Sequence, residues 1–206
     1  MRSAPMTRAF YARPAVEVAR DLLGAILRHG TASARIVEVE AYLGENDAAA
    51  HSARGLTPRT QVLFGPPGHA YVYLIYGMHH CLNIAVERTG NAGCVLLRAV
   101  EPIADVTLPT NGPGRLTRAL GITLEHYGVD LTRGSLTVCT PETVCAPERP
   151  LTFEIGVSPR IGIKKADGLP LRFFIKGNRY VSGLGSQRLA ARAAADDQDL
   201  AGNVVR

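Results

Sequence analysis

The stretch of residues 35–101 constrains the fold most, because strand-like runs recur along it and carry many polar side chains. In the first run, residues 35–42, apolar and polar residues alternate. A strand turns successive side chains to opposite faces, so Glu38, Glu40 and Tyr42 should share one face. This run therefore predicts a β-strand that presents two carboxylates and a phenol together.

Turn residues separate this run from further elements. Residues 65–68, Gly-Pro-Pro-Gly, form a firm turn. Apolar residues at helical spacing predict helices over 15–23 and 115–120. Strand-like runs are found at 70–76, 81–86, 94–100, 151–163 and 171–175. Short strands joined by turns indicate an antiparallel or mixed sheet with a few helices.

Length and composition fit one domain or two small ones, because 206 residues with 46% hydrophobic residues can bury a proper core. The net charge of +5 suits a polyanion partner, although many basic proteins bind no nucleic acid. The four cysteines form no C-x-x-C pair, which favours free thiols in a reducing compartment over a zinc site. Without a long apolar segment, we expect a cytoplasmic or nucleoid-associated location.

Glu38 and Glu40 have two interpretations. They could be solvated carboxylates on an exposed strand face. Alternatively, one of them is a general base, which requires a partly enclosed site and a nearby orienting cation. Arg98, on a neighbouring predicted strand, could be that cation.

Aromatic residues near these carboxylates also have two interpretations. Tyr42, His51 and Tyr73 could be ordinary packing and turn residues, or the walls of a slot for a planar base. Tyr76 and Met78 flank a glycine at the expected tip of a hairpin. Such an apolar tip suggests a dimer contact or a wedge into a nucleic-acid groove.

His79 and His80 do not predict a metal site. Adjacent side chains on a strand point to opposite faces, so both imidazoles cannot easily bind one ion. No phosphate-binding loop, dinucleotide fingerprint or Ser-His-Asp arrangement stands out either. We therefore expect no metal and no cofactor.

A set of motifs in this chain resembles those of the alkyladenine (3-methyladenine) DNA glycosylase family of the human type. The likeness runs from about Pro14 to Ser182, in order and with compatible spacing. The motifs are R-I-V-E-V-E-A-Y-L-G (35–44), A-A-A-H-S (48–52), T-P-R (57–59), Y-V-Y-L-I-Y-G-M (71–78), C-L-N-I (81–84), C-V-L-L-R-A-V-E-P (94–102), G-P-G-R-L-T-R-A-L-G-I (112–122), R-I-G-I (160–163) and L-R-F-F-I-K-G (171–177).

The resemblance implies an α+β fold (mixed α/β) rather than a helix-hairpin-helix glycosylase. We expect one domain over residues 1–206, with an antiparallel sheet, surrounding helices and a protruding β-hairpin. Residues 1–13 and about 184–206 are expected to be flexible ends. The expected state is a monomer without a membrane partner.

The function implied is base excision repair of duplex DNA. Such an enzyme flips alkylated or deaminated purines, such as 3-methyladenine, hypoxanthine or 1,N6-ethenoadenine, out of the helix. It then hydrolyses the N-glycosidic bond and leaves an abasic site. Residues 35–101 contain no lysine that could form a Schiff base with the sugar, so we expect a monofunctional enzyme.

By the same resemblance, three residues carry the chemistry and two act on the duplex. Glu40 is the general base that activates water, and Arg98 and the main-chain carbonyl of Ile161 help to hold that water. Tyr76 fills the gap left by the flipped nucleotide, and Met78 lies beside it in the minor groove.

Four further residues form the implied base pocket. Tyr42 stacks on one face of the base, and His51 and Tyr73 stack on the other. The His51 main chain also contacts the base edge. Asn83 discriminates against guanine through the exocyclic amino group of that base.

The chain departs from the family pattern near the expected hairpin. His79 and His80 replace an aromatic pair, and the turn before Tyr71 lacks a basic residue. Two rival functions stay open: a non-catalytic binder of damaged or structured nucleic acid, and a basic scaffold domain whose tyrosines only pack.

Overall fold

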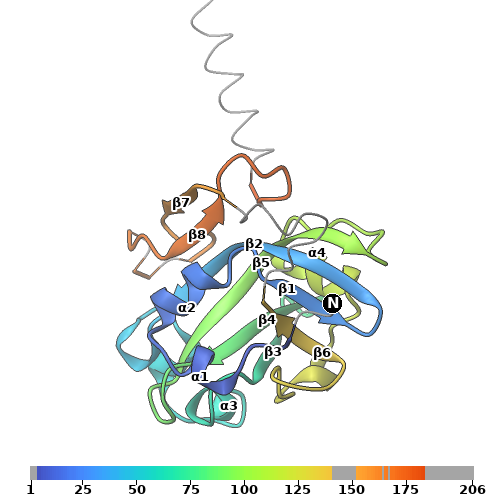
Figure 1. Ribbon diagram of the computed structural model, residues 1–206. Coiled ribbons are helices and arrows are strands. Elements are labelled where there is room, and N and C mark those ends of the chain that lie inside the picture. Colours follow the sequence, from blue (N-terminus) through green and yellow to red (C-terminus); the bar gives the residue numbers. More distant parts are fainter. Residues whose placement is uncertain (1–3, 141–151, 164, 167, 184–206) are drawn as a thin grey trace, which may run out of the picture.

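One antiparallel sheet organises the protein (Figure 1). The computed structural model describes residues 4–140, 152–163, 165–166 and 168–183. Within these ranges every neighbouring pair of strands is antiparallel. The strands are β1 (Ile26–His29), β2 (Ala32–Tyr42), β3 (Ala70–Ile75), β4 (His79–Val86), β5 (Gly93–Ala104), β6 (Leu136–Cys139), β7 (Ile155–Ser158) and β8 (Arg172–Ile175). The predicted α+β class, with one domain and an antiparallel sheet, is confirmed.

The long strand β2 lies where three other strands meet. β5 pairs along one edge of β2, whereas β1 and β8 share the other edge. β8 takes the part of that edge formed by residues 38–40. The pairing with β5 shifts register on both sides of Glu38, as expected of a β-bulge. Residues 38–40 are therefore enclosed between β5 and β8.

Both faces of the sheet are covered. Val37, Val39 and Ala41 have no exposed surface and belong to the main hydrophobic core. The alternate residues face the other way, where Tyr71 and Cys94 belong to a second, smaller cluster. The alternation in residues 35–42 thus predicted the faces of β2 correctly, but neither face is open to water.

Short helices complete the fold. They are α1 (Arg8–Tyr11), α2 (Ala15–Asp21), α3 (Gln61–Phe64) and α4 (Pro113–Ala119), with 3-10 turns η1 (Gly44–Asn46), η2 (His51–Arg54) and η3 (Leu124–His126). α2 packs on β2 and β5, and α4 packs on β4 and β5. None of the helices in the described ranges has the length and apolar character needed to cross a lipid bilayer.

The opening segment packs onto this framework from residue 4 onward. The main-chain N–H of Met6 donates a hydrogen bond to the carbonyl of Val138, at 2.8 Å. Tyr11 is fully buried, under Gly68 of the Gly-Pro-Pro-Gly turn. Residues 1–3 and 184–206, which include the expected flexible tail, lie outside the described residues.

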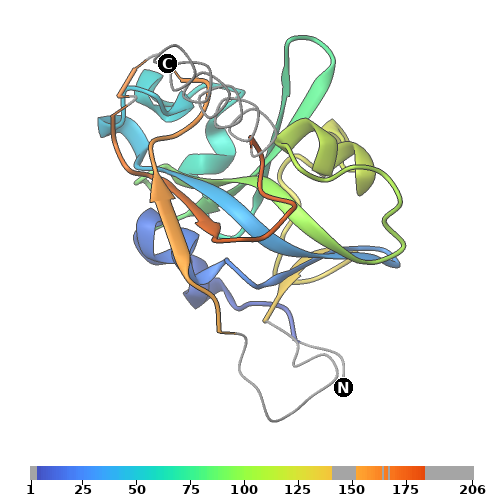
Figure 2. The same ribbon diagram turned by 90° about the horizontal axis from the view of Figure 1, so that it is seen from above.

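Strands β3 and β4 form a hairpin that extends from the body of the domain (Figure 2). Its tip is Tyr76-Gly77-Met78, with φ angles of 52° at Tyr76 and 69° at Gly77. A left-handed backbone is uncommon at a residue with a side chain, and here it ends the extended conformation of β3. The alternation of residues 70–76 therefore stops one residue earlier than predicted.

Several predicted boundaries need correction. β4 begins at His79 instead of Cys81, and β5 continues to Ala104. β6 was not predicted, because prolines at 141, 147 and 150 made the region 123–150 resemble a loop. The run 151–163 contains only the short strand β7, and Leu151 lies outside the described residues.

Candidate active site

A cavity of about 330 Å³ lies between the base of the hairpin, β2, β5 and the segment after β7. The structure brings eight of the nine predicted site residues to its lining: Glu40, Tyr42, His51, Tyr73, Tyr76, Asn83, Arg98 and Ile161. The ninth, Met78, does not line the cavity but is exposed at the hairpin tip. Residues separated by up to 121 positions therefore share one site.

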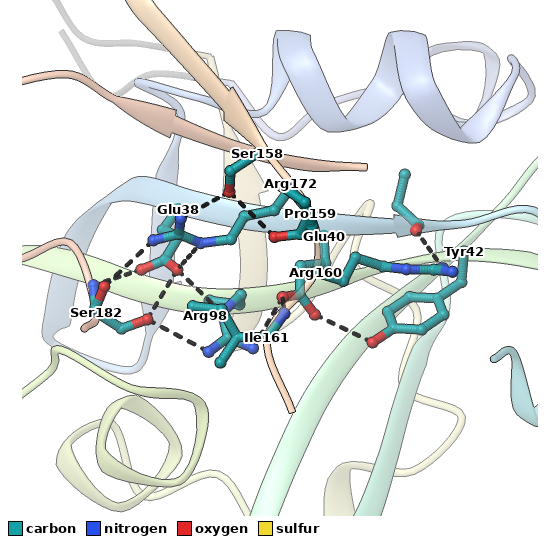
Figure 3. A network of polar contacts seen from close by, with 11 residues as sticks. Glu38, Glu40, Tyr42, Arg98, Ser158, Pro159, Arg160, Ile161, Arg172 and Ser182 are labelled. Atoms are coloured by element: carbon teal, nitrogen blue, oxygen red, sulfur yellow. Dashed lines mark hydrogen bonds and ion pairs between the residues drawn. The ribbon is translucent and has the colours of Figure 1, made fainter. Parts of the chain in front are cut away.

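Glu40 lines this cavity, and Figure 3 shows the polar contacts of its carboxylate. Its side chain has no exposed surface. Oε1 accepts a hydrogen bond from the main-chain N–H of Ile161 at 2.7 Å and lies 3.1 Å from Nη1 of Arg98. Oε2 accepts a hydrogen bond from the hydroxyl of Tyr42 at 3.0 Å. Three donors thus hold the carboxylate, and a carboxylate has about four acceptor positions.

The burial of Glu40 corrects one interpretation of the sequence. Glu38 and Glu40 are both fully buried, so they are not solvated carboxylates on an exposed face. The required cation is Arg98, which lies between them: its Nε donates to Glu38 at 3.0 Å, and its Nη1 lies near Glu40. Burial alone would lower the pKa of Arg98, but the two carboxylates outweigh burial and raise it.

Tyr42 stands between Glu40 and a second buried ion pair. The guanidinium of Arg160 lies 4.6 Å from the centre of the Tyr42 ring. The same guanidinium binds both carboxylate oxygens of Asp47, at 2.5 and 2.9 Å. Burial first, and then the charge of Glu40, raise the pKa of Tyr42, so the phenol keeps the proton that it donates.

His51 and Tyr73 form part of the aromatic wall, together with Tyr71. The rings of His51 and Tyr73 are 4.6 Å apart, and Nδ1 of His51 makes a 2.7 Å hydrogen bond with the hydroxyl of Tyr71. Burial, together with the charges of Arg59 and Arg54, lowers the pKa of His51 to about 4. The imidazole is therefore neutral at neutral pH.

Asn83 is held in a fixed orientation on β4. Its Nδ2 donates to the carbonyl of Tyr71 at 3.1 Å, and its Oδ1 lies 4.0 Å from the thiol of Cys94, which donates to it. Cys81 and Cys94 both line the cavity. Both thiols are free and buried, as is that of Cys139, which agrees with the prediction of free cysteines. The fourth cysteine, Cys145, lies outside the described residues.

The hairpin tip carries the most exposed aromatic side chain of the described residues. Tyr76 is 84% exposed and Met78 is 69% exposed. Tyr76 nevertheless borders the cavity, on the side of Tyr73. A strict alternation along residues 70–76 predicts that Tyr76 lies on the face opposite Tyr73, but the left-handed backbone at Tyr76 ends that alternation.

A second, more open cavity of about 740 Å³ adjoins the first, since Ala49 and His51 line both. Its lining includes Arg54, Arg59 and Lys165, against one carboxylate, Glu45, among the described residues. The surface beside the aromatic cavity is therefore positively charged, as contact with phosphates would require.

Sequence reasoning missed some of the lining residues and the contact between Ile161 and Glu40. Tyr71 was identifiable, because it lies two residues from Tyr73 on one strand face; the thiols of Cys81 and Cys94 gave no signal. At Ile161 the main-chain N–H, not the carbonyl, reaches Glu40. Contact of that carbonyl with a water stays a prediction. In the described part of the chain, no three His, Cys, Asp or Glu side chains gather as metal ligands would.

Comparison with known proteins gives consistent matches. The family described as "Methylpurine-DNA glycosylase" matches residues 9–179. A protein of Methanoculleus marisnigri is 48% identical over 189 residues, covering 84% of this chain and 96% of its own. One of Myxococcus xanthus is 48% identical, covering 86% and 93%, and one of Legionella pneumophila strain Lens is 46% identical, covering 88% and 99%. All three carry the name "Putative 3-methyladenine DNA glycosylase".

The lowered pKa of His51 predicts a pH dependence of stability. Between pH 6.5 and about 4 the unfolded chain binds a proton at this imidazole that the folded protein does not bind. The contribution of His51 to the free energy of unfolding should thus be complete above pH 6.5. Below that pH the free energy of unfolding should fall, by up to about 1.4 kcal/mol per pH unit. Urea unfolding across this range should give a shallower slope for His51→Asn than for the wild type.

The control for this measurement is His79→Asn, which removes an exposed imidazole from β4. It should keep the wild-type slope. An identical slope in His51→Asn and the wild type would contradict the burial of a neutral imidazole.

Proposed function

The chain belongs to the methylpurine-DNA glycosylase family, and from this membership we propose that it excises damaged purines by hydrolysis with a water that Glu40 activates. The family assigns a DNA glycosylase of base excision repair. The single observation that carries the finer proposal is the position of Glu40. A buried carboxylate with three donors lines a cavity beside several aromatic rings.

The proposed reaction adds water across the bond between C1′ and the base. Glu40 accepts one proton of the water through its remaining acceptor position on Oε2, while the oxygen bonds to C1′. The base leaves with the electrons of the broken bond. Arg98 and the carbonyl of Ile161 would hold the water in line with this bond, as a general base requires a correctly placed partner.

A nucleobase inside a duplex is out of reach of such a group, so the nucleotide must leave the helix. Flipping costs on the order of a few kcal/mol, and less for a damaged or mispaired base. The flipped base would enter the cavity that these rings line, with Tyr42 stacking on one face and His51 and Tyr73 on the other. The His51 main chain would contact the base edge, and Asn83 would discriminate against the amino group of guanine.

The charges around the cavity favour cationic alkylated purines such as 3-methyladenine. Electron-rich rings attract a cation, and the neutral form of His51 does not repel it. Arg160 lies on Tyr42, but its charge is balanced by Asp47. Such bases leave without protonation. Hypoxanthine and 1,N6-ethenoadenine, which are neutral, are the further proposed substrates, and each must take up a proton as it leaves.

The partner is duplex DNA, gripped through the minor groove. Tyr76 at the hairpin tip would fill the space of the flipped nucleotide and Met78 would lie beside it. Arg54, Arg59 and Lys165 supply positive charge next to the cavity. A monomer suffices for this arrangement, and a DNA substrate implies a cytoplasmic, nucleoid-associated location.

A non-catalytic binder of damaged nucleic acid is the alternative. It would need the wedge and the aromatic walls but not a carboxylate oriented by Arg98, Ile161 and Tyr42. Burying an ion pair has a desolvation cost, and a binding protein would gain nothing from this pair. Its presence therefore favours the catalytic function over the binding function.

Replacing Glu40 separates these two functions. Glu40→Gln keeps the size of the side chain but removes the base, so excision from a duplex with hypoxanthine or 1,N6-ethenoadenine should slow by about 10²- to 10⁴-fold. Abasic sites are measured by alkaline cleavage of the labelled strand under single-turnover conditions, and lesion binding is measured in parallel. Binding should persist.

The matched control is Glu101→Gln. Glu101 is also paired with an arginine between β2 and β5, at 2.9 Å from Arg35, but it does not line the cavity. This variant should excise at the wild-type rate. A wild-type rate in Glu40→Gln, or no excision by the wild type, would refute the proposed mechanism.

Tyr76→Ala tests the wedge. Loss of the ring should weaken binding to a lesion duplex by about 1–3 kcal/mol, as stacking on a base contributes that much. Binding to undamaged duplex should change less. Fluorescence anisotropy in a Glu40→Gln background measures both affinities without turnover, and Leu74→Ala on the same hairpin is the control. Equal loss on both duplexes would show that Tyr76 fills no gap.

Sodium borohydride tests the monofunctional mechanism. An enzyme that cleaves through a Schiff base is trapped on its DNA by reduction, whereas hydrolysis by water leaves nothing to trap. We expect no covalent complex on a denaturing gel. A complex that disappears in Lys165→Ala would instead identify the lysine of the adjoining cavity as a nucleophile.

A further inference from the structure

We propose that Glu38 is a positioning residue, which fixes both Arg98 and the Ile161 main chain against Glu40. This inference rests on the proposed role of Glu40 as the general base. Glu38 does not line the cavity and cannot touch the substrate, so it would act only through its neighbours. Figure 3 shows Glu38 in contact with Arg98, which also binds Glu40, and with Arg172, which also binds Ser158.

Glu38 is the most heavily bonded carboxylate of the network. Its side chain has no exposed surface. Oε1 accepts hydrogen bonds from Nε of Arg98, Nε of Arg172 and the hydroxyl of Ser182, at 3.0, 2.6 and 2.8 Å. Oε2 accepts one from the main-chain N–H of Ser182, at 2.5 Å. A carboxylate held by four donors has little freedom to move.

The first connection runs through Arg98. Its guanidinium is planar and rigid, so contacts that hold two of its nitrogen atoms also fix the position of the third. Nε donates to Glu38 and Nη2 donates to the Ser182 hydroxyl at 3.3 Å. Only Nη1 remains for Glu40. Without Glu38, Arg98 could rotate and bind both oxygens of Glu40, which would block the acceptor position proposed for water.

The second connection runs through Arg172 on β8. Its Nη1 donates to the hydroxyl of Ser158 at 2.9 Å, and that hydroxyl donates to the carbonyl of Pro159 at 3.0 Å. Ser158 is the last residue of β7, and the chain reaches Ile161 three residues later. Glu38 therefore anchors, through Arg172, the turn whose N–H binds Glu40.

Charge balance supports the same role. Glu38 and Glu40 carry two negative charges, and Arg98 and Arg172 carry two positive charges. Glu38 pairs with Arg172 and shares Arg98 with Glu40, so the charge of Arg172 is balanced without a contact to Glu40. A role in stability alone is a weaker explanation, because buried ion clusters often add little to the free energy of unfolding.

The test compares Glu38→Gln with the control Glu101→Gln. Both remove a carboxylate that pairs with an arginine between β2 and β5, but only Glu38 connects to Glu40. Single-turnover excision by Glu38→Gln should be slower by about 10- to 100-fold, since small misplacement of reacting groups costs that much. The affinity for lesion DNA should change by less than about threefold, because Glu38 does not line the cavity and its loss affects the rate of excision instead of binding.

A second variant keeps the test decisive if Glu38→Gln does not fold. Ser182→Ala removes the hydroxyl that contacts both Glu38 and Arg98 but leaves the main-chain N–H. Excision should slow by about 3- to 10-fold with unchanged lesion affinity, as one positioning contact is lost. Urea unfolding identifies any loss of folded protein.

The outcomes separate the two proposals. Slow excision with retained affinity in Glu38→Gln or Ser182→Ala supports the positioning role. Wild-type excision in every folded variant of this pair, while Glu40→Gln is inactive, overturns the role of Glu38 and leaves the mechanism intact. An active Glu40→Gln instead overturns the mechanism itself. A loss of excision that is fully explained by the loss of folded protein in urea unfolding also overturns the positioning role, because it would reflect stability alone.

Discussion

The rest of the site depends on one constraint: two carboxylates are buried side by side on β2, and each must be compensated. A buried charge without a partner is costly, so the protein supplies donors from β2 itself and from four other segments, one of which contributes Ser182. Arg98 of β5 lies between Glu38 and Glu40, and Arg172 of β8 binds Glu38. Ile161 and Tyr42 complete the shell of Glu40. The sheet brings these groups together because β5 and β8 flank β2 at residues 38–40.

The two faces of this sheet have different surroundings. One side is a hydrophobic core under α2 and α4, which makes β2 a rigid support. The other side carries the aromatic cluster of the cavity, extended by the hairpin of β3 and β4. Catalytic groups on strands are held more precisely than groups on loops. The tip at Tyr76 is the most exposed part of the site.

Much of this arrangement could be predicted from local pattern. The alternation of residues 35–42 assigned Glu40 and Tyr42 to one face, and the turns around the tyrosine-rich run indicated a hairpin with Tyr76 and Met78 at its tip. Other features were beyond local pattern. The burial of Glu38 and Glu40 depends on β8, more than 130 residues away in sequence. The backbone reversal at Tyr76 depends on a φ angle that residue type does not dictate.

The sequence by itself determined the family and the fold class, since its motifs occur in order over most of the chain, and it predicted which residues form the site. Only the tertiary structure decided which donors hold Glu40. Strand alternation fixes the face of a side chain, but its burial and partners are set by segments distant in sequence. That is why the N–H of Ile161, as the support of Glu40, and Arg172 and Ser182, as the supports of Glu38, emerge only when the sheet is assembled.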